Sequence, residues 1–138
     1  MEKISTATYE IHVDEHGILR RRILDKVNVD LGAVIEVQAI CKKLAAGKKN
    51  LALIDARAFH TYTPEAMQYI KTSMDSSRIA TAVLTESLGI RIMVDYMEKV
   101  MKMKSPIKIF AEEDEAIEWL LKFKAEKITQ KMKLRASA

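Results

Sequence analysis

The chain has 138 residues, of which 49% are hydrophobic and 30% are charged, a composition typical of one soluble globular domain. Its formal net charge is +4, and its single cysteine, Cys41, excludes a disulfide framework within the chain. No run approaches the 18 apolar residues of a transmembrane helix, and the start "MEKISTATYE" lacks the apolar core of a signal peptide, so we expect a cytoplasmic protein.

Two strands and a tight turn are predicted near the start. Tyr9, Ile11 and Val13 alternate with polar residues, and "DEHG" separates them from the run "ILRRRIL". This pattern predicts an N-terminal β-hairpin. Neighbouring side chains of a strand point to opposite faces, so at most two of the three consecutive arginines share a surface. We interpret the run as charges that keep an exposed strand from pairing at its edge.

The next segments alternate between helix and strand. Asp30 is a predicted N-cap, and apolar residues then recur at helical spacing, which places Cys41 in the buried stripe as a structural thiol. "NLALIDA" and "RIATAVLT" are short apolar runs of the kind found in strands covered on both faces. Thr63 and Pro64 predict a helix start. A helix from about Leu88 to Met103 follows, then a strand in "SPIKIF" and a helix opened by "AEEDE".

This order predicts an α/β fold with a mixed, largely parallel sheet whose centre contains residues 51–55 and 79–84, with 107–110 as a further strand. We expect a single domain over residues 1–138, with a basic C-terminal helical extension at about 124–138. The excess of lysine there is interpreted as a solvated helix end rather than a nucleic-acid or membrane contact.

Three stretches resemble the small SpoIIAA-like proteins, a group related to the STAS fold and to SEC14-like lipid-binding domains. They are "GKKNLALIDARAFHTYTPEAMQYI", "RIATAVLTESLGIRIMVDYMEKV" and "SPIKIFAEEDEAIEWLLKF", and the likeness covers roughly residues 8 to 123. The resemblance implies a SpoIIAA-like (STAS-like) sheet with packed helices, a bacterial origin, no established enzymatic activity, and a role in binding or regulation.

The densest polar group follows the strand at 51–55. Ligands of open α/β sheets bind beyond the carboxyl ends of the strands, and a helix N-terminus there favours an anion. These residues form a candidate recognition loop: Asp55, Arg57, His60, Thr61 and Thr63. Asp55 with His60 also allows acid–base chemistry, but turn and cap roles account for these side chains without a reaction.

STAS anti-sigma antagonists, which this chain resembles in layout, carry a phosphorylatable serine in a D-S-S-G motif at the start of the helix that follows the central strand. Thr63 occupies the nearest matching place here, and Thr61 is the next candidate. The motif itself is missing, and Pro64 follows Thr63. Thr63 is therefore the candidate phosphorylation site that the resemblance implies.

The helix at about 88–103 has apolar residues around more of its circumference than one core stripe requires. Flexible methionines suit adaptable binding surfaces, and they also fill irregular gaps in a core. Four residues form the candidate partner or ligand surface: Met93, Met97, Val100 and Met101. Such a surface predicts self-association, for example as a homodimer, or contact with a lipid-like ligand.

The common nucleotide and zinc motifs are absent, and His12, His16 and His60 are scattered, so we expect no metal and no cofactor. The leading interpretation is a non-enzymatic binding or regulatory module that acts through protein–protein contact. The alternatives are a carrier of a small apolar or lipid-like ligand, and an enzyme that uses Asp55 and His60. No nucleic-acid partner is expected.

Overall fold

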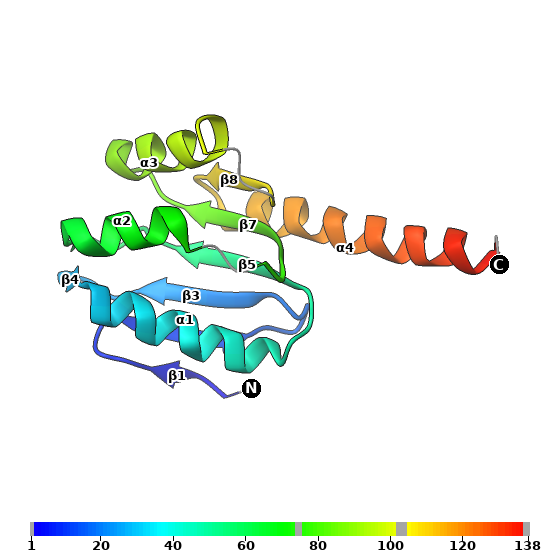
Figure 1. Ribbon diagram of the computed structural model, residues 1–138, viewed down its shortest axis with the longest axis horizontal. Coiled ribbons are helices and arrows are strands. Elements are labelled where there is room, and N and C mark those ends of the chain that lie inside the picture. The colour runs from blue at the N-terminus through cyan, green and yellow to red at the C-terminus, as the bar shows by residue number, and fades with distance from the viewer. Residues whose placement is uncertain (1, 74–75, 102–104, 137–138) are drawn as a thin grey trace.

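A computed structural model describes residues 2–73, 76–101 and 105–136, and its main feature is a six-stranded sheet (Figure 1). The strands follow in the spatial order β1 (Ile4–Ser5), β2 (Tyr9–Val13), β3 (Leu19–Ile23), β5 (Asn50–Asp55), β7 (Arg78–Leu84) and β8 (Ile107–Phe110). The first three strands pair antiparallel, and β3, β5, β7 and β8 pair parallel. The predicted mixed, largely parallel sheet with an N-terminal hairpin is confirmed.

Helices cover both faces of this sheet and create two apolar cores. Helices α1 (Leu31–Ala45), α2 (Pro64–Thr72) and α3 (Leu88–Lys99) pack on one face, whereas α4 (Glu113–Ala136) packs on the other through Ala116 and Leu120. In Figure 1, α4 extends well past the end of the sheet, so the predicted extension continues this helix from residue 124 to 136. Helix α3 ends at Lys99, before the predicted Met103, and residues 102–104 and 137–138 lie outside the described residues.

The arginine run lies on β3, which is an internal strand. Its neighbours are β2 on one side and β5 on the other, so the interpretation of these charges as protection of an exposed edge is wrong. As strand alternation requires, Arg20 reaches Glu113 of α4 on one face, while Arg21 projects to the face that α1, α2 and α3 cover. One cation of the run is thereby placed beneath three helices.

A second, two-stranded sheet was not predicted. β4 (Val27–Val29) precedes α1, β6 (His60–Tyr62) precedes α2, and the two pair in parallel. The Lys26 amide also donates to the Phe59 carbonyl at 2.6 Å, and the Thr63 amide donates to the Val29 carbonyl at 3.0 Å. The connections that lead into α1 and α2 are therefore joined to each other.

The starts of α1, α2 and α3 have the capping that their sequences favour. Asp30 accepts from the Ala33 amide at 2.8 Å, Thr63 from the Ala66 amide at 3.2 Å, and Ser87 from the Ile90 amide at 3.4 Å. None of the helices in the described part of the chain is long and apolar enough to cross a membrane.

Candidate functional site

The first half of the predicted recognition loop is tied down by an ion pair. Arg57 donates to both carboxylate oxygens of Asp55, from Nε at 2.9 Å and from a terminal nitrogen at 2.8 Å. The Arg57 amide also donates to the same carboxylate at 3.2 Å, which closes the turn after β5. Burial raises the pKa of Asp55, but the hydrogen bonds and charge of Arg57 outweigh it, so the pKa lies below its usual value.

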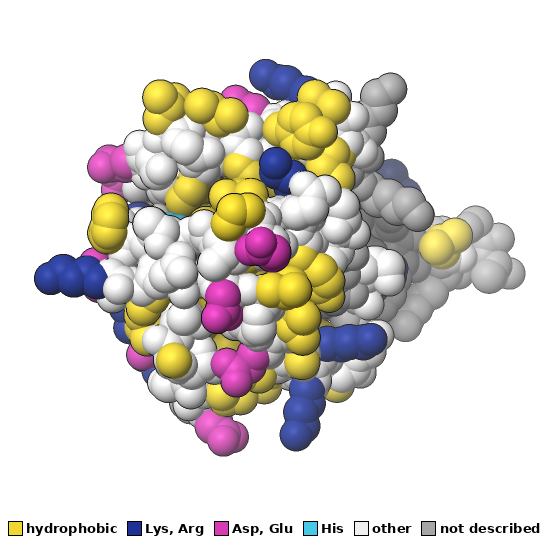
Figure 2. All heavy atoms as spheres, turned by 60° about the vertical axis from the view of Figure 1, so that its left-hand side comes forward, with side chains coloured by type: hydrophobic (Ala, Val, Ile, Leu, Met, Phe, Trp, Pro, Cys, Tyr) yellow, Lys and Arg dark blue, Asp and Glu magenta, His cyan; other side chains and the backbone are white. Residues whose placement is uncertain are grey.

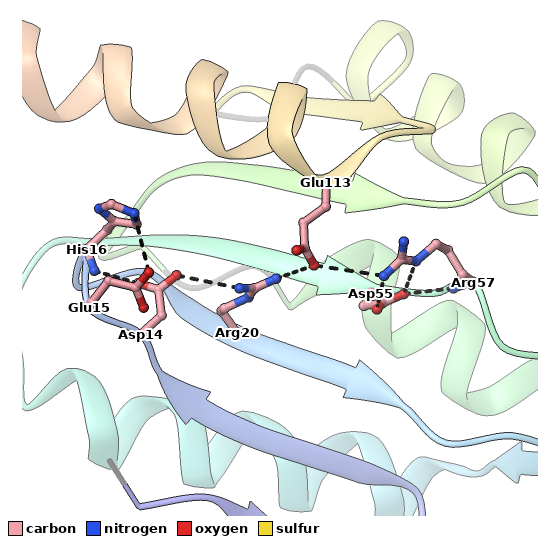
Figure 3. A network of polar contacts seen from close by, with 7 residues as sticks. All are labelled: Asp14, Glu15, His16, Arg20, Asp55, Arg57 and Glu113. Carbon is pink, nitrogen blue, oxygen red and sulfur yellow. Dashed lines mark hydrogen bonds and ion pairs between the residues drawn. The ribbon is translucent and has the colours of Figure 1, made fainter.

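This ion pair belongs to a longer chain of charges on the α4 face (Figure 3). Glu113, in the first turn of α4, lies 3.8 Å from Arg57 and also accepts from Arg20 on β3. Arg20 in turn lies 3.9 Å from Asp14, whose buried carboxylate accepts from two amides of the hairpin turn. This series of charged side chains links the hairpin turn, the start of α4 and the end of β5. Its role is therefore structural.

The second half of the loop is organised around β6. The His60 ring nitrogen Nδ1 lies 2.7 Å from the Ala58 carbonyl, and Thr61 donates to the Asn28 side chain on β4 at 2.9 Å. Thr63 caps α2. Within the described residues, Asp55 and His60 contact different partners. The structure therefore divides the predicted loop into two local groups.

Helix α3 carries an exposed apolar stripe. Leu88, Ile92, Tyr96 and Val100 recur every four residues, and each remains 44% to 69% exposed. Figure 2 shows hydrophobic side chains along the upper part of this face, where α3 lies. The predicted excess of apolar surface on this helix therefore exists. Within the predicted set, Val100 belongs to the stripe and Met101 is half-buried.

The methionines of α3 face inward instead. Met97 is buried at 3% exposure, and both Met93 and Met97 line a cavity beneath the helix. The four residues predicted as one partner or ligand surface thus divide between two places. Side-chain direction on a helix changes by about 100° per residue, so residues 93 and 97 lie on a different side from residues 92 and 96.

The cavity has a volume of about 530 Å³ and lies between the sheet and helices α1, α2 and α3. Ligand pockets in proteins typically measure about 300 to 1,000 Å³. Most of its walls are apolar, formed by side chains such as Val37, Ile54, Val83 and Val94, and exposed Ile35 at the lining shows that it reaches the surface. Cys41 also lines it, so the only thiol of the chain faces this space.

Two arginines interrupt the apolar lining. Arg78 is buried and uses its donors on Asn50 at 2.7 Å and on Thr81 at 3.0 Å. Arg21 differs, because its Nε is buried without a hydrogen-bond partner. No hydrogen bond or ion pair joins the Arg21 side chain to any other residue in the described part of the chain.

Two tyrosines share the space with Arg21. Tyr9 and Tyr62 both line the cavity, and burial raises the pKa of each phenol, against the opposing charge of Arg21. Both therefore remain protonated hydrogen-bond donors at neutral pH. A guanidinium and two phenols beside an apolar wall can bind the polar end of a small molecule.

The sequence contains only a faint signal for this cavity. Arg21 stands inside a run of three arginines that resembles an exposed charge cluster, and Tyr62 stands in a loop-like segment. Among the described residues, no group of three or more His, Cys, Asp or Glu side chains could hold a metal ion. Of the predicted site residues, Met93 and Met97 line the cavity and the others do not.

Comparisons with known proteins give a family and a fold. Residues 11–124 match the family described as "Domain of unknown function (DUF7793)". A crystal structure of an uncharacterized protein of the DUF3478 family with a SpoIIAA-like fold, from Shewanella loihica PV-4, is similar with a TM-score of 0.61 at 13% identity. The match covers 85% of this chain and 98% of that one, so the SpoIIAA-like fold is shown. No curated protein matches the sequence.

Proposed function

The chain belongs to the family described as "Domain of unknown function (DUF7793)", and from that premise we propose that it is a non-enzymatic binding module which encloses a small apolar molecule between its sheet and helices α1, α2 and α3. The observation that carries this proposal is the cavity of about 530 Å³. Apolar walls give a ligand the favourable transfer from water that drives such binding, about 0.8 kcal/mol for each buried methylene group.

The contacts of Asp55 and His60, the candidate acid–base pair, support a non-enzymatic role. The Asp55 carboxylate is engaged by Arg57 through both oxygens, which leaves it a weak base. The His60 ring nitrogen Nδ1 lies 2.7 Å from the backbone carbonyl of Ala58 rather than beside an acid. These contacts favour capping and turn roles for the loop.

The experiment uses the single thiol as a reporter. Cys41 lines the cavity, so 1-decanol bound there should slow the reaction of Cys41 with N-ethylmaleimide. Native mass spectrometry of the same samples counts the bound alcohol. An unchanged labelling rate together with no bound decanol at saturation would reject the proposal.

A matched pair of variants tests the location. Ile54→Phe adds volume to the cavity lining and should abolish protection by decanol. Ile79→Phe changes a half-buried strand residue on the opposite face, against the α4 core, and should leave protection intact. Equal loss of protection in both variants would show that decanol binds elsewhere.

Self-association is a second candidate function, supported by the stripe on α3. Contiguous exposed apolar surface is uncommon on monomeric proteins and often marks a contact with another subunit. Leu88, Ile92, Tyr96 and Val100 present such a surface. Regulation through Thr63 is the further proposal that the resemblance implies, since a phosphate there would lie at the positive end of α2.

A further inference from the structure

We infer that the cavity selects amphiphilic monocarboxylates, with the carboxylate head on Arg21 between Tyr9 and Tyr62 and the hydrocarbon chain against the apolar walls. This inference rests on the proposed function, because it names the ligand class of the same cavity. It also explains why a charged residue stands at a position where its strand neighbours are apolar.

Arg21 occupies an apolar position on its strand. On β3 it lies opposite Ile11 of β2 and opposite Ile54 of β5, both on the face beneath the helices. Its neighbours Arg20 and Arg22 lie on the other face, where they pair with Glu113 and Glu10. Only Arg21 of the three therefore projects its charge into an apolar space.

The guanidinium of Arg21 has a hydrogen-bond donor without a partner. A guanidinium has five N–H donors, and a buried donor without a partner costs free energy that a bound acceptor recovers. The Nε of Arg21 is such a donor. The edge formed by Nε and a terminal nitrogen matches the two oxygens of a carboxylate. Arg21 lines the cavity and is only half-buried, so rotation of its side chain can present that edge to a ligand.

The other cations of the cavity are less suited to this role. Arg78 already donates to Asn50 and Thr81, and Lys42 is exposed on α1, where water solvates its charge. One uncommitted positive charge in an apolar site favours a ligand with one negative charge. A second negative charge would remain unpaired in the same low-dielectric space.

The phenols complete the head-group site. Tyr9 is buried at 4% exposure, and Tyr62 is half-buried on β6, at the start of α2. Each hydroxyl can donate to a carboxylate oxygen while Arg21 supplies the charge. Val83, Val94 and Met97 lie along the remaining walls, where a hydrocarbon chain would pack.

The test compares decanoate with 1-decanol, which has the same chain length and no charge. The measured quantity is the ligand concentration that gives half-maximal protection of Cys41 from N-ethylmaleimide. The assay is run at about pH 7.5, where the carboxylate of decanoate is ionised. Arg21→Gln should raise this concentration about tenfold for decanoate, as expected for loss of a charge-assisted hydrogen bond. The value for decanol should stay within about twofold.

Arg22→Gln is the matched control, because it removes the same charge from the next position on the opposite, exposed face. It should leave the half-maximal concentration unchanged for both ligands. The inference is overturned if both variants weaken protection by decanoate equally. It is also overturned if Arg21→Gln weakens protection by decanoate no more than protection by decanol. If neither ligand protects Cys41 in the unmodified protein, the proposed cavity function fails with it.

A third ligand distinguishes the head groups. Decyl phosphate carries a charge of about −1.5 to −2 at neutral pH. It should protect Cys41 at a higher concentration than decanoate, since Arg21 neutralises only one charge. Tighter binding of decyl phosphate, lost in Arg21→Gln, would overturn the assignment to a carboxylate and point to a phosphate head instead.

Discussion

Replacement of Arg21 by Met should stabilise the protein. The methionine side chain is unbranched, so it can follow the path of the arginine stem between Ile11 and Ile54 without the guanidinium at its end. The substitution removes a charge that burial penalises and that no residue of the described part of the chain pairs. A residue selected for binding rather than for stability should behave in this way.

The size of the effect follows from the exposure of the side chain. A buried polar group without a partner costs about 1 to 3 kcal/mol. Arg21 is only partly buried, so the lower end of that range applies, and we expect the free energy of unfolding to rise by about 1 kcal/mol. For a domain of this size, that corresponds to an increase in Tm of about 4 °C.

Urea unfolding followed by far-ultraviolet circular dichroism measures the change. The proteins are first refolded from denaturant, because a co-purified ligand would stabilise the unmodified protein selectively. Arg22→Met is the control, because it removes only an exposed ion pair with Glu10 at 3.2 Å, and loss of such a pair should lower stability slightly. A loss of about 1 kcal/mol or more in Arg21→Met would instead mean that the guanidinium has a stabilising partner.

Four further outcomes are expected. Thr63→Ala should lower the free energy of unfolding by about 1 kcal/mol in urea titrations, whereas Thr63→Ser keeps the cap, and equal stability of all three proteins would contradict the cap. Because the pKa of Asp55 is lowered in the folded protein, its contribution is present above the ordinary value of 3.8 and is lost as the pH falls through the folded pKa. Thermal scans from pH 6 to about 2 should therefore show a smaller acid-induced loss of stability in Asp55→Asn, and parallel curves would count against the pairing with Arg57. Ile92→Glu should reduce the mass measured by light scattering if the α3 stripe joins two copies, with exposed Glu98→Gln as the control, and an unchanged oligomer would exclude this surface. Chelator treatment should leave Tm unchanged, and a large drop would reveal a structural metal.

The fold was largely predictable, because hydrophobic periodicity and capping residues specify elements locally. The runs around residues 51–55 and 79–84 are mostly apolar, as expected of strands covered on both faces, and Asp30 and Thr63 mark the starts of α1 and α2. The short strands β4 and β6 escaped prediction, since three residues such as "HTY" carry too little periodicity and gain their hydrogen bonds from a partner more than thirty positions away.

The cavity was less predictable for a different reason. Periodicity indicates which side of a helix faces the sheet, but it does not indicate how closely three helices approach one another above it. Arg21 shows the difficulty most clearly, because its meaning depends on β3 having β5 as a neighbour, which is a long-range pairing.

The pairing of β4 with β6 has a mechanical consequence. The amides of Lys26 and Thr63 donate hydrogen bonds on either side of that pair, so the connections that lead into α1 and α2 share a common base. On the other side of the cavity, α2 meets α3 through a lysine over an aromatic ring, with Lys71 Nζ 5.2 Å from the Tyr96 ring centroid. This contact between α2 and α3 involves side chains alone, whereas backbone hydrogen bonds join the connections that lead into α1 and α2.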